Sequence, residues 1–99
     1  MSFVAIYRWT IEEAHQQSFR DRWRQATLRL RALGGLGSCL TRDEEGDFVA
    51  IALWESEEAR ERAFAAVTPL PPQAGVLAFE ESKLEVEDYL WAISPFEKG

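Results

Sequence analysis

His15 is the only histidine in this chain of 99 residues, and it is the best candidate for acid–base chemistry. An unperturbed imidazole titrates near neutral pH, so His15 could act as a general base that removes the proton of a phenol. The spacing of His15 to Phe19 and Trp23 places it on one face of a helix, so the alternative is a partly exposed boundary residue. A metal site is not expected, because the chain has no second histidine and only one cysteine.

Trp54 is the second candidate, because it closes an apolar run just before a predicted helix. Its indole could stack on a flat aromatic substrate or help to transfer an electron to dioxygen. The alternative is a structural role, in which the ring plugs one end of the core or a dimer seam. Further aromatic residues could line a pocket for a planar ligand, although each one alone could equally be core or interface. These candidate substrate-binding residues are Tyr7, Trp9, Phe19, Trp23 and Trp91.

The charge distribution excludes some classes of partner. A net charge of −6 argues against nucleic acid, because binding to phosphates requires a basic surface. Residues 1–42 hold seven Arg against three acidic residues, whereas residues 43–99 hold fourteen acidic residues against four basic ones. On the first predicted helix, Arg20, Arg24 and Arg31 could guide an anionic substrate or form a solvated face that pairs with acids.

The single cysteine and the hydropathy pattern suggest where the protein works. Cys39 lies within a predicted strand, where we expect a buried and unreactive thiol. One cysteine fits a reducing compartment, and no apolar run approaches the roughly 20 residues that cross a bilayer. The N-terminal residues also do not resemble a secretory signal. We therefore predict a cytoplasmic protein whose residues 1–99 form one domain, without a membrane partner.

The first half of the chain predicts a strand, a helix and a hairpin. Residues 2–9 alternate as a strand, and Thr10 is expected to cap a helix that runs to about Leu33. Residues 36–42 and 48–54 are expected to pair as a hairpin, because an acidic turn with a glycine separates them.

The second half predicts one more helix and one more strand. Ser56 is the expected N-cap of the helix, which ends at a proline-rich segment. Residues 75–82 are ambiguous and are expected as a short helical turn or an irregular loop. The last strand is placed at residues 84–93, with a bulge near residues 87–88, where the apolar alternation changes phase. The order β-α-β-β-α-β predicts an α+β, ferredoxin-like antiparallel sheet with both helices on one face.

The predicted strands also indicate an assembly. Those at residues 2–9 and 48–54 are apolar on both faces, and two helices can cover only one face of a sheet. The other face would then expose more apolar surface than a soluble monomer usually does. We therefore predict a homodimer in which the two sheets pack face to face.

Two segments carry a resemblance to a known family. Residues 35–40, GLGSCL, resemble a second strand of that family. Residues 48–56, FVAIALWES, resemble a third strand that ends in Trp before a capped helix. With these motifs and its element order, the chain resembles the antibiotic biosynthesis monooxygenase superfamily, whose members are dimeric α/β barrels.

The resemblance implies a site between the sheet and the helices of each subunit. Trp54 matches a Trp that contributes to this site, and no cofactor is implied for the oxygenases of the family. Family members often place an Asn at the position of Ala50, and those that degrade haem use a His from the second-helix region. This chain contains no Asn, and its only His is on the first predicted helix.

Three functions remain open on this resemblance. The first is a cofactor-independent monooxygenase of an aromatic or quinol-like small molecule, with aromatic residues around Trp54 holding the ring and His15 as the base. The second is a non-catalytic dimer that binds a small hydrophobic ligand or serves as an accessory protein. The third, a haem-degrading enzyme, is disfavoured by the missing Asn and second-helix His. A polar residue facing Trp54 inside a closed cavity would favour the enzyme, and a purely apolar lining would favour binding.

Overall fold

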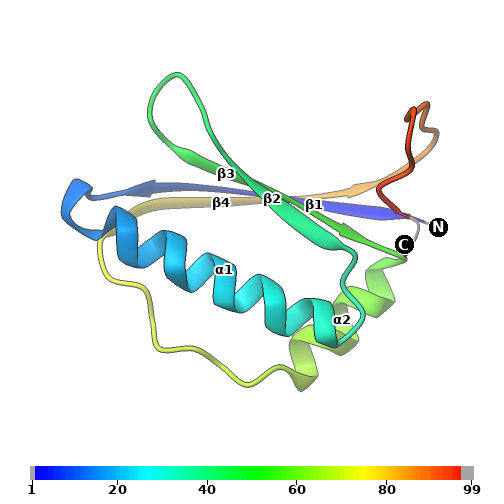
Figure 1. Cartoon of the computed structure of the whole chain (residues 1–99), viewed down its shortest axis with the longest axis horizontal. Coiled ribbons are helices and arrows are strands. Elements are labelled where there is room, and N and C mark those ends of the chain that lie inside the picture. Colours follow the sequence, from blue (N-terminus) through cyan, green and yellow to red (C-terminus); the bar gives the residue numbers. More distant parts are fainter. Residues whose placement is uncertain (1, 97–99) are drawn as a thin grey trace.

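The computed structural model describes residues 2–96 and has a four-stranded antiparallel sheet with two α helices on one face (Figure 1). The sheet order is β2-β3-β1-β4, which confirms the predicted ferredoxin-like α+β fold. Within residues 2–96, no helix is long and apolar enough to span a bilayer. The elements in chain order are β1 Phe3–Ile11, η1 Glu13–His15, α1 Gln16–Ala32, β2 Gly37–Arg42, β3 Phe48–Trp54, α2 Glu57–Ala66 and β4 Val76–Glu85.

The helix-facing side of the sheet carries the core. Alternate residues of β1 and β3 point toward the helices, since successive side chains of a strand lie on opposite faces. Phe3 pairs with Trp54 at one end of the strands, and both are buried with Ala63 of α2. At the other end, Phe48 of β3 is buried with Phe19 of α1. The sheet is therefore closed at both ends, and the middle of this face is lined by smaller residues.

The first helix begins later than the sequence predicts. Thr10 does not cap it, because β1 continues to Ile11 and Thr10 pairs there with Ala78 of β4. Its hydroxyl donates instead to Asp47 Oδ1 at 2.8 Å. The predicted cap is wrong because strand pairing, which is a tertiary interaction, outweighs the local preference of threonine for a helix start.

The position of the last strand is the larger correction. β4 occupies Val76–Glu85, so the segment expected as a loop is a strand, and residues 86–96 lie outside helices and strands. The expected bulge at residues 87–88 is absent from this strand, and its register instead shifts opposite Thr10 and Ile11. Every residue of β4 is exposed in the single chain. An edge strand without a buried face has no alternation of apolar residues, so periodicity could not reveal it.

The two expected signals around β3 are confirmed. β2 and β3 form the predicted hairpin, and Ser56 Oγ accepts a hydrogen bond from the N–H of Ala59 at 3.1 Å as the N-cap of α2.

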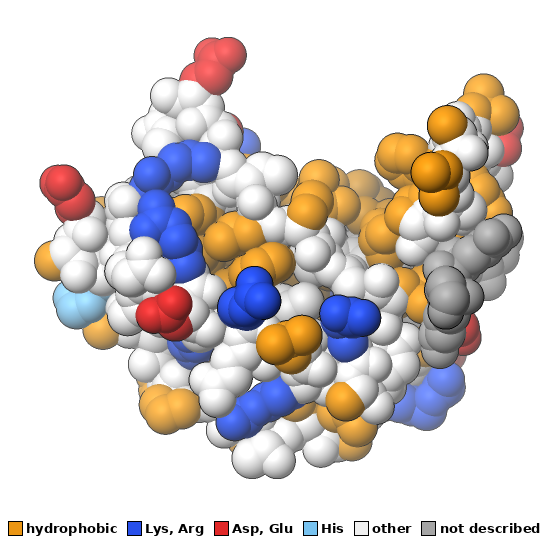
Figure 2. All heavy atoms as spheres, viewed as in Figure 1, with side chains coloured by type: hydrophobic (Ala, Val, Ile, Leu, Met, Phe, Trp, Pro, Cys, Tyr) orange, Lys and Arg blue, Asp and Glu red, His pale blue; other side chains and the backbone are white. Residues whose placement is uncertain are grey.

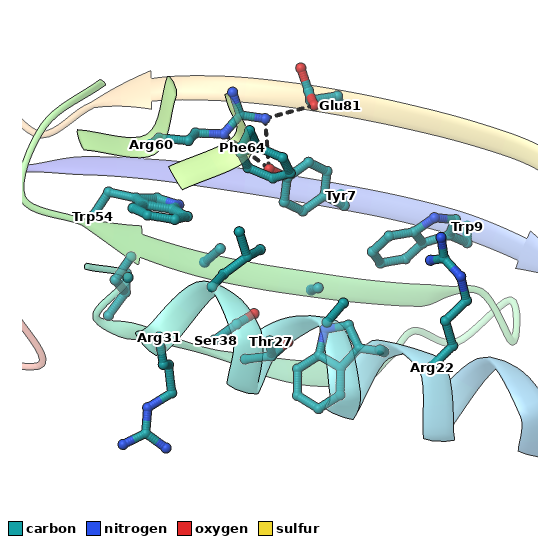
Figure 3. Close-up of a pocket in the computed structure, with 18 of the residues that line it drawn as sticks. Tyr7, Trp9, Arg22, Thr27, Arg31, Ser38, Trp54, Arg60, Phe64 and Glu81 are labelled. Carbon is teal, nitrogen blue, oxygen red and sulfur yellow. Dashed lines mark hydrogen bonds and ion pairs between the residues drawn. The ribbon is translucent and has the colours of Figure 1, made fainter. Parts of the chain in front are cut away.

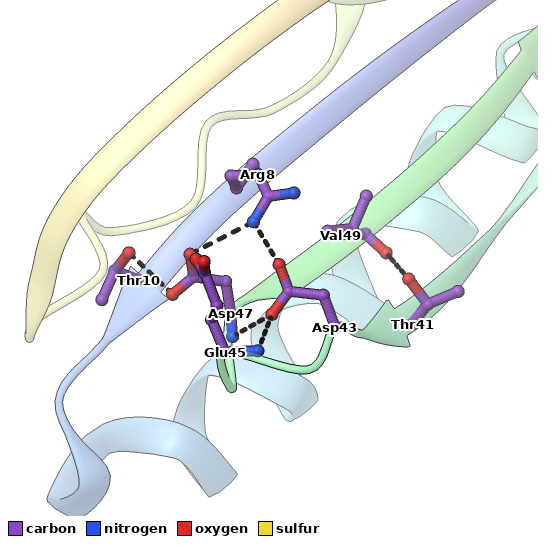
Figure 4. Close-up of polar contacts among 7 residues, drawn as sticks. All are labelled: Arg8, Thr10, Thr41, Asp43, Glu45, Asp47 and Val49. Atoms are coloured by element: carbon purple, nitrogen blue, oxygen red, sulfur yellow. Dashed lines mark hydrogen bonds and ion pairs between the residues drawn. The ribbon is translucent and has the colours of Figure 1, made fainter.

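The hairpin turn is held by charged groups (Figure 4). The Arg8 guanidinium contacts the carboxylate of Asp43 and lies 3.2 Å from Asp47 Oδ2. Desolvation alone would raise the pKa of the Asp43 carboxyl, but hydrogen bonds from the Asp47 N–H and from Arg8 outweigh it and lower this pKa. Asp43, Glu45 and Asp47 each place a carboxylate oxygen within 4.8 Å of the others. Because Arg8 already pairs with two of these acids, Asp43 and Asp47, we interpret the cluster as a structural ion-pair network of the turn.

Candidate functional site

A cavity of about 330 Å³ lies between the helix-facing side of the sheet and the helices α1 and α2 (Figure 3). All four strands and both α helices contribute residues to its lining. Small-molecule sites are typically apolar hollows of about 300–1,000 Å³ with a few converging polar groups. This cavity is therefore the candidate functional site.

Aromatic rings form much of its wall. Tyr7 and Trp9 of β1 are stacked with their ring centroids 5.7 Å apart, and Phe79 of β4 stacks on Tyr7 at 6.3 Å. Phe19 of α1 meets Trp9 edge-on at 4.9 Å. Such contacts hold the rings in fixed orientations, so a flat ligand would meet a preformed surface.

Small residues of β3 leave the space that the rings surround. Ala50 and Ala52 line the cavity where larger residues would fill it, and Ala50 is only 1% exposed. Gly35 has a similar effect beside Trp54, because a Cβ there would lie 3.4 Å from the indole and 3.1 Å from the Leu30 carbonyl oxygen. The cavity therefore depends on the small size of these side chains.

One end of the cavity is polar. Arg60 of α2 donates to the Tyr7 hydroxyl oxygen twice, from Nε at 3.1 Å and from Nη2 at 2.8 Å. The same Nη2 lies 3.0 Å from Glu81 Oε2 on β4. Burial raises the pKa of the Tyr7 phenol, although the hydrogen bond and the charge of Arg60 oppose this effect. Tyr7 therefore stays a neutral phenol at physiological pH.

Two further polar atoms of the lining are buried without a partner. Within residues 2–96, neither Trp54 Nε1 nor Ser38 Oγ has a hydrogen-bond partner. The Trp54 side chain is 2% exposed, so its N–H is withdrawn from bulk solvent. A buried donor without a partner costs about 1–3 kcal/mol, and this cost is recovered when a ligand supplies an acceptor. Both atoms belong to residues that line the cavity, so a ligand there could meet them.

The structure brings most of the sequence-predicted site residues to this cavity. The lining includes Tyr7, Trp9, Phe19, Trp23 and Trp54. These residues come from β1, α1 and β3, and only the packing of both layers could place them together.

His15 is not among the lining residues. It closes the 3-10 turn η1 at the start of α1, and its ring packs against the backbone of Gly75. A Cβ on Gly75 would lie 2.6 Å from His15 Cδ2, so the imidazole occupies the space that a side chain there would take. His15 is therefore placed outside the aromatic cavity.

Trp91 also lies away from this cavity. It lines a second, more open hollow of about 810 Å³, together with Ile93 of the C-terminal segment and Cys39 and Ile51 of the sheet. Cys39 is exposed, which corrects the expectation of a buried thiol. The reason is that Cys39 points to the sheet face that the helices do not cover.

Sequence reasoning missed the polar end of the cavity. Glu81 and Phe79 belong to the segment that was expected to be a loop, so no strand register was assigned to them. Arg60 lies four residues, about one helical turn, after the Ser56 cap. This helical spacing could have suggested that the Arg60 side chain faces the sheet near Trp54. Ser38 was covered by the strand prediction, but its orientation depends on the hairpin register.

The chain matches no protein-family model and no curated protein sequence. Solved structures, in contrast, match nearly its whole length. A variant of SnoaB, a cofactor-independent oxygenase from Streptomyces nogalater, superimposes with a TM-score of 0.72 at 20% identity, covering 90% of this chain and 96% of that chain. A monooxygenase from the gene ActVA-Orf6 of Streptomyces coelicolor, in complex with nanaomycin D, gives 0.66 at 20% identity and covers 93% of each chain. A variant of MhuD with two manganese protoporphyrin IX molecules per active site gives 0.70 at 18% identity, covering 91% and 99%.

The chain also shares this fold with a putative antibiotic biosynthesis monooxygenase from Bacillus cereus, which superimposes with a TM-score of 0.63 at 17% identity and covers 94% of this chain and 98% of that chain. The resemblance noted in the sequence is thus confirmed at the level of the fold. In this fold Trp54 is the last residue of β3 and lines the cavity. At identities of 17–20%, the similarity establishes the fold alone.

Proposed function

We propose that this chain is a cofactor-independent monooxygenase that acts on a planar aromatic or quinol-like molecule held in the aromatic cavity. The observation that carries the proposal is the pair of unpartnered buried polar atoms, Trp54 Nε1 and Ser38 Oγ, in a lining that is largely aromatic and aliphatic. Neighbours of the same fold support it, because one is a cofactor-independent oxygenase and another is a monooxygenase in complex with a small ligand.

The proposed chemistry balances without an added reductant. A hydroxyarene with a free C–H position and one dioxygen give a quinone and one water, so the substrate supplies all four electrons. One oxygen atom becomes the new carbonyl, and the other leaves as water. The protein then has to orient the ring, favour its ionised form and exclude bulk water from the reacting carbon.

The aromatic residues would perform the first of these tasks. Tyr7, Trp9 and Phe19 would contact the faces and edges of the ring, while Trp23 and Trp54 would close the cavity from α1 and β3. Trp54 Nε1 would donate a hydrogen bond to an oxygen of the substrate. Trp91 has no place in this arrangement, since it lies at the second hollow.

The alternative of a non-catalytic binding protein makes a different prediction about the lining. A cavity that serves only to hold a hydrophobic ligand has no need of polar groups, because each one has to be desolvated. Here Tyr7, Arg60 and Ser38 bring polar atoms to it, which favours the enzyme. A haem-degrading activity is not proposed, because no histidine lines the cavity within residues 2–96.

Oxygen consumption tests the proposal directly. We expect dioxygen uptake with members of a panel of phenols and hydroquinones, and quinone formation detected by absorbance. Ala50→Leu should abolish it by filling the cavity, whereas Ala78→Leu on the exposed strand β4 should not. His15→Ala should leave uptake unchanged, because His15 is outside the lining. Absence of uptake with the whole panel, although its members bind, would favour the binding protein instead.

We also propose that the protein works as a homodimer through the sheet face opposite the helices. Val4 and Ile6 of β1 and Ile51 and Leu53 of β3 lie on this face, and each is only half-buried in the single chain. Figure 2 shows hydrophobic side chains along the upper edge of the molecule, which is hollowed between the hairpin turn and the C-terminal segment. A second copy would cover this apolar surface, as isologous dimers do.

Sedimentation velocity and thiol labelling test the dimer together. Cys39 pairs with Ile51 in the sheet and is exposed, so a partner sheet should slow its reaction with a thiol reagent. Ile51→Glu should produce monomers and faster labelling, and Gln25→Glu on the exposed side of α1 is the matched control. A wild-type protein that sediments as a monomer at micromolar concentration would refute the dimer.

A further inference from the structure

The Tyr7 hydroxyl is held in an unusual way for a phenol. Its oxygen accepts two N–H groups of Arg60, at 3.1 and 2.8 Å, so both of its lone-pair directions are used. Its own proton must therefore point elsewhere, and within residues 2–96 the Tyr7 hydroxyl takes part in hydrogen bonds only as an acceptor. Figure 3 shows Tyr7 with its ring along the wall of the cavity and its hydroxyl facing Arg60.

The Arg60 guanidinium is fixed from several sides. Glu81 Oε2 lies 3.0 Å from Nη2, and the guanidinium carbon lies 4.6 Å from the centroid of the Phe64 ring. The Arg60 side chain is only 12% exposed, so its charge acts in surroundings with little water. An immobilised cation of this kind makes the Tyr7 proton a stronger hydrogen-bond donor, because the phenol oxygen is polarised by two charged donors.

The charged residues of the cavity lining also favour a negatively charged ligand. Its charged residues are Arg22 and Arg31 of α1, Arg60 of α2 and Glu81 of β4, whereas β2 and β3 contribute none. The Arg31 side chain extends away from the cavity in Figure 3. Arg22 and Arg60 still outnumber the single carboxylate, in a protein whose net charge is −6. The cavity is thus locally positive within an acidic protein.

We propose that Tyr7 and Arg60 form an oxyanion site that binds the ionised oxygen of an aromatic ligand, such as a phenolate or a hydroxyquinone anion. This inference rests on the proposed function and specifies the form in which the substrate is taken. Tyr7 donates to the ligand oxygen, and Arg60 stabilises its negative charge through the shared phenol oxygen. The ligand loses its proton to water, since the site lowers the pKa of the ligand, and no base side chain is needed. His15, outside the cavity, is then not required for this step.

A coumarin pair tests the inference. In 7-hydroxycoumarin the phenol and the phenolate absorb at different wavelengths. The methyl ether 7-methoxycoumarin has the same ring system, is larger by one methyl group, and cannot ionise. We expect the full-length protein to bind the phenolate about tenfold or more tighter than the methoxy compound, as one charge-assisted hydrogen bond would produce. The absorbance titration of bound 7-hydroxycoumarin should show its pKa lowered by about one unit or more.

Two variants and two matched controls separate this role from a structural one. Tyr7→Phe keeps the ring but removes the donor, and the double variant Arg60→Gln with Glu81→Gln removes the charges together. Both should lose the preference for the phenolate and return the ligand pKa to its solution value. Tyr89→Phe changes the other tyrosine of the chain, outside the cavity.

The second control is the double variant Lys83→Gln with Glu57→Gln. Lys83 Nζ and Glu57 Oε2 are 4.0 Å apart and connect β4 to α2, as Glu81 and Arg60 do, but they lie outside the lining. This control should behave as wild type. Equal binding of the two coumarins with an unshifted ligand pKa would overturn the oxyanion site and leave the proposed function in place. Failure of both coumarins to bind, together with no dioxygen uptake from the phenol panel, would overturn both.

Discussion

Replacing Trp54 by phenylalanine distinguishes a ligand-binding tryptophan from a structural plug. The indole is 2% exposed, packs against Phe64 with ring centroids 6.2 Å apart, and carries an N–H without a partner in residues 2–96. If Trp54 is only a structural plug, its replacement should mainly remove packing contacts. If it binds a ligand, its unpartnered N–H destabilises the ligand-free protein and becomes hydrogen-bonded when the ligand is present.

The magnitudes follow from these two contributions. Trp54→Phe leaves about 40 Å³ unfilled, which costs about 1 kcal/mol at about 24 cal/mol per Å³, and the removed carbon atoms cost about 1 kcal/mol more. Removing a buried donor without a partner returns about 1–3 kcal/mol. The free energy of unfolding should therefore change by less than about 1 kcal/mol, which is a shift in Tm of less than about 8 °C for a domain of this size.

Ligand binding should change in a different manner. The lost hydrogen bond from Nε1 should weaken the binding of 7-methoxycoumarin by about twofold to tenfold, as measured by isothermal titration calorimetry. Trp91→Phe, in the C-terminal segment, is the control for tryptophan replacement outside the cavity. A fall in Tm of more than about 12 °C with unchanged affinity would refute the reasoning and identify Trp54 as a plug.

Three further predictions concern the scaffold. Ser56→Ala should lower the free energy of unfolding by about 1 kcal/mol in urea denaturation, because the first turn of α2 loses its cap; no change would mean that water replaces the cap fully. Gly75→Ala should lower Tm, since φ is +78° and the new Cβ would meet His15 within 2.7 Å; an unchanged Tm would contradict this packing. The raised pKa of Tyr7 means that the folded state holds this proton to higher pH than the unfolded state does, so stability should fall as pH rises above about 10. Tyr7→Phe should reduce that fall in urea titrations at alkaline pH and Tyr89→Phe should not, and equal slopes would contradict the raised pKa.

The sequence was sufficient to predict those elements in which local signals, such as caps and turn residues, agree with the pattern of buried apolar residues. β3 is apolar on both faces and is followed by a serine with acidic residues behind it, so the strand, its end at Trp54 and the Ser56 cap could all be predicted. The hairpin could be predicted for the same reason, because Gly46 provides the positive φ of 89° that its turn needs.

The predictions were wrong where a strand is defined by its backbone pairing with a neighbouring strand and has no buried face. β4 is exposed along its whole length in the single chain, so only its register with β1 defines it. Because the last strand was predicted at residues 84–93, Phe79 and Glu81 were not recognised as strand residues that line the cavity. Thr10 was misread for a related reason, because its pairing partner Ala78 lies on that same strand.

The amino-acid sequence by itself determined the order of the elements, the two-sided apolar sheet and the aromatic residues available for a site. These properties depend on periodicity and on local caps, which operate over a few neighbouring residues. Only the tertiary structure decided which side chains share the cavity: it brought Arg60 to Tyr7 and left His15 and Trp91 outside. The physical reason is that a site joins residues far apart in the chain, and strand register and helix packing set the distances between them.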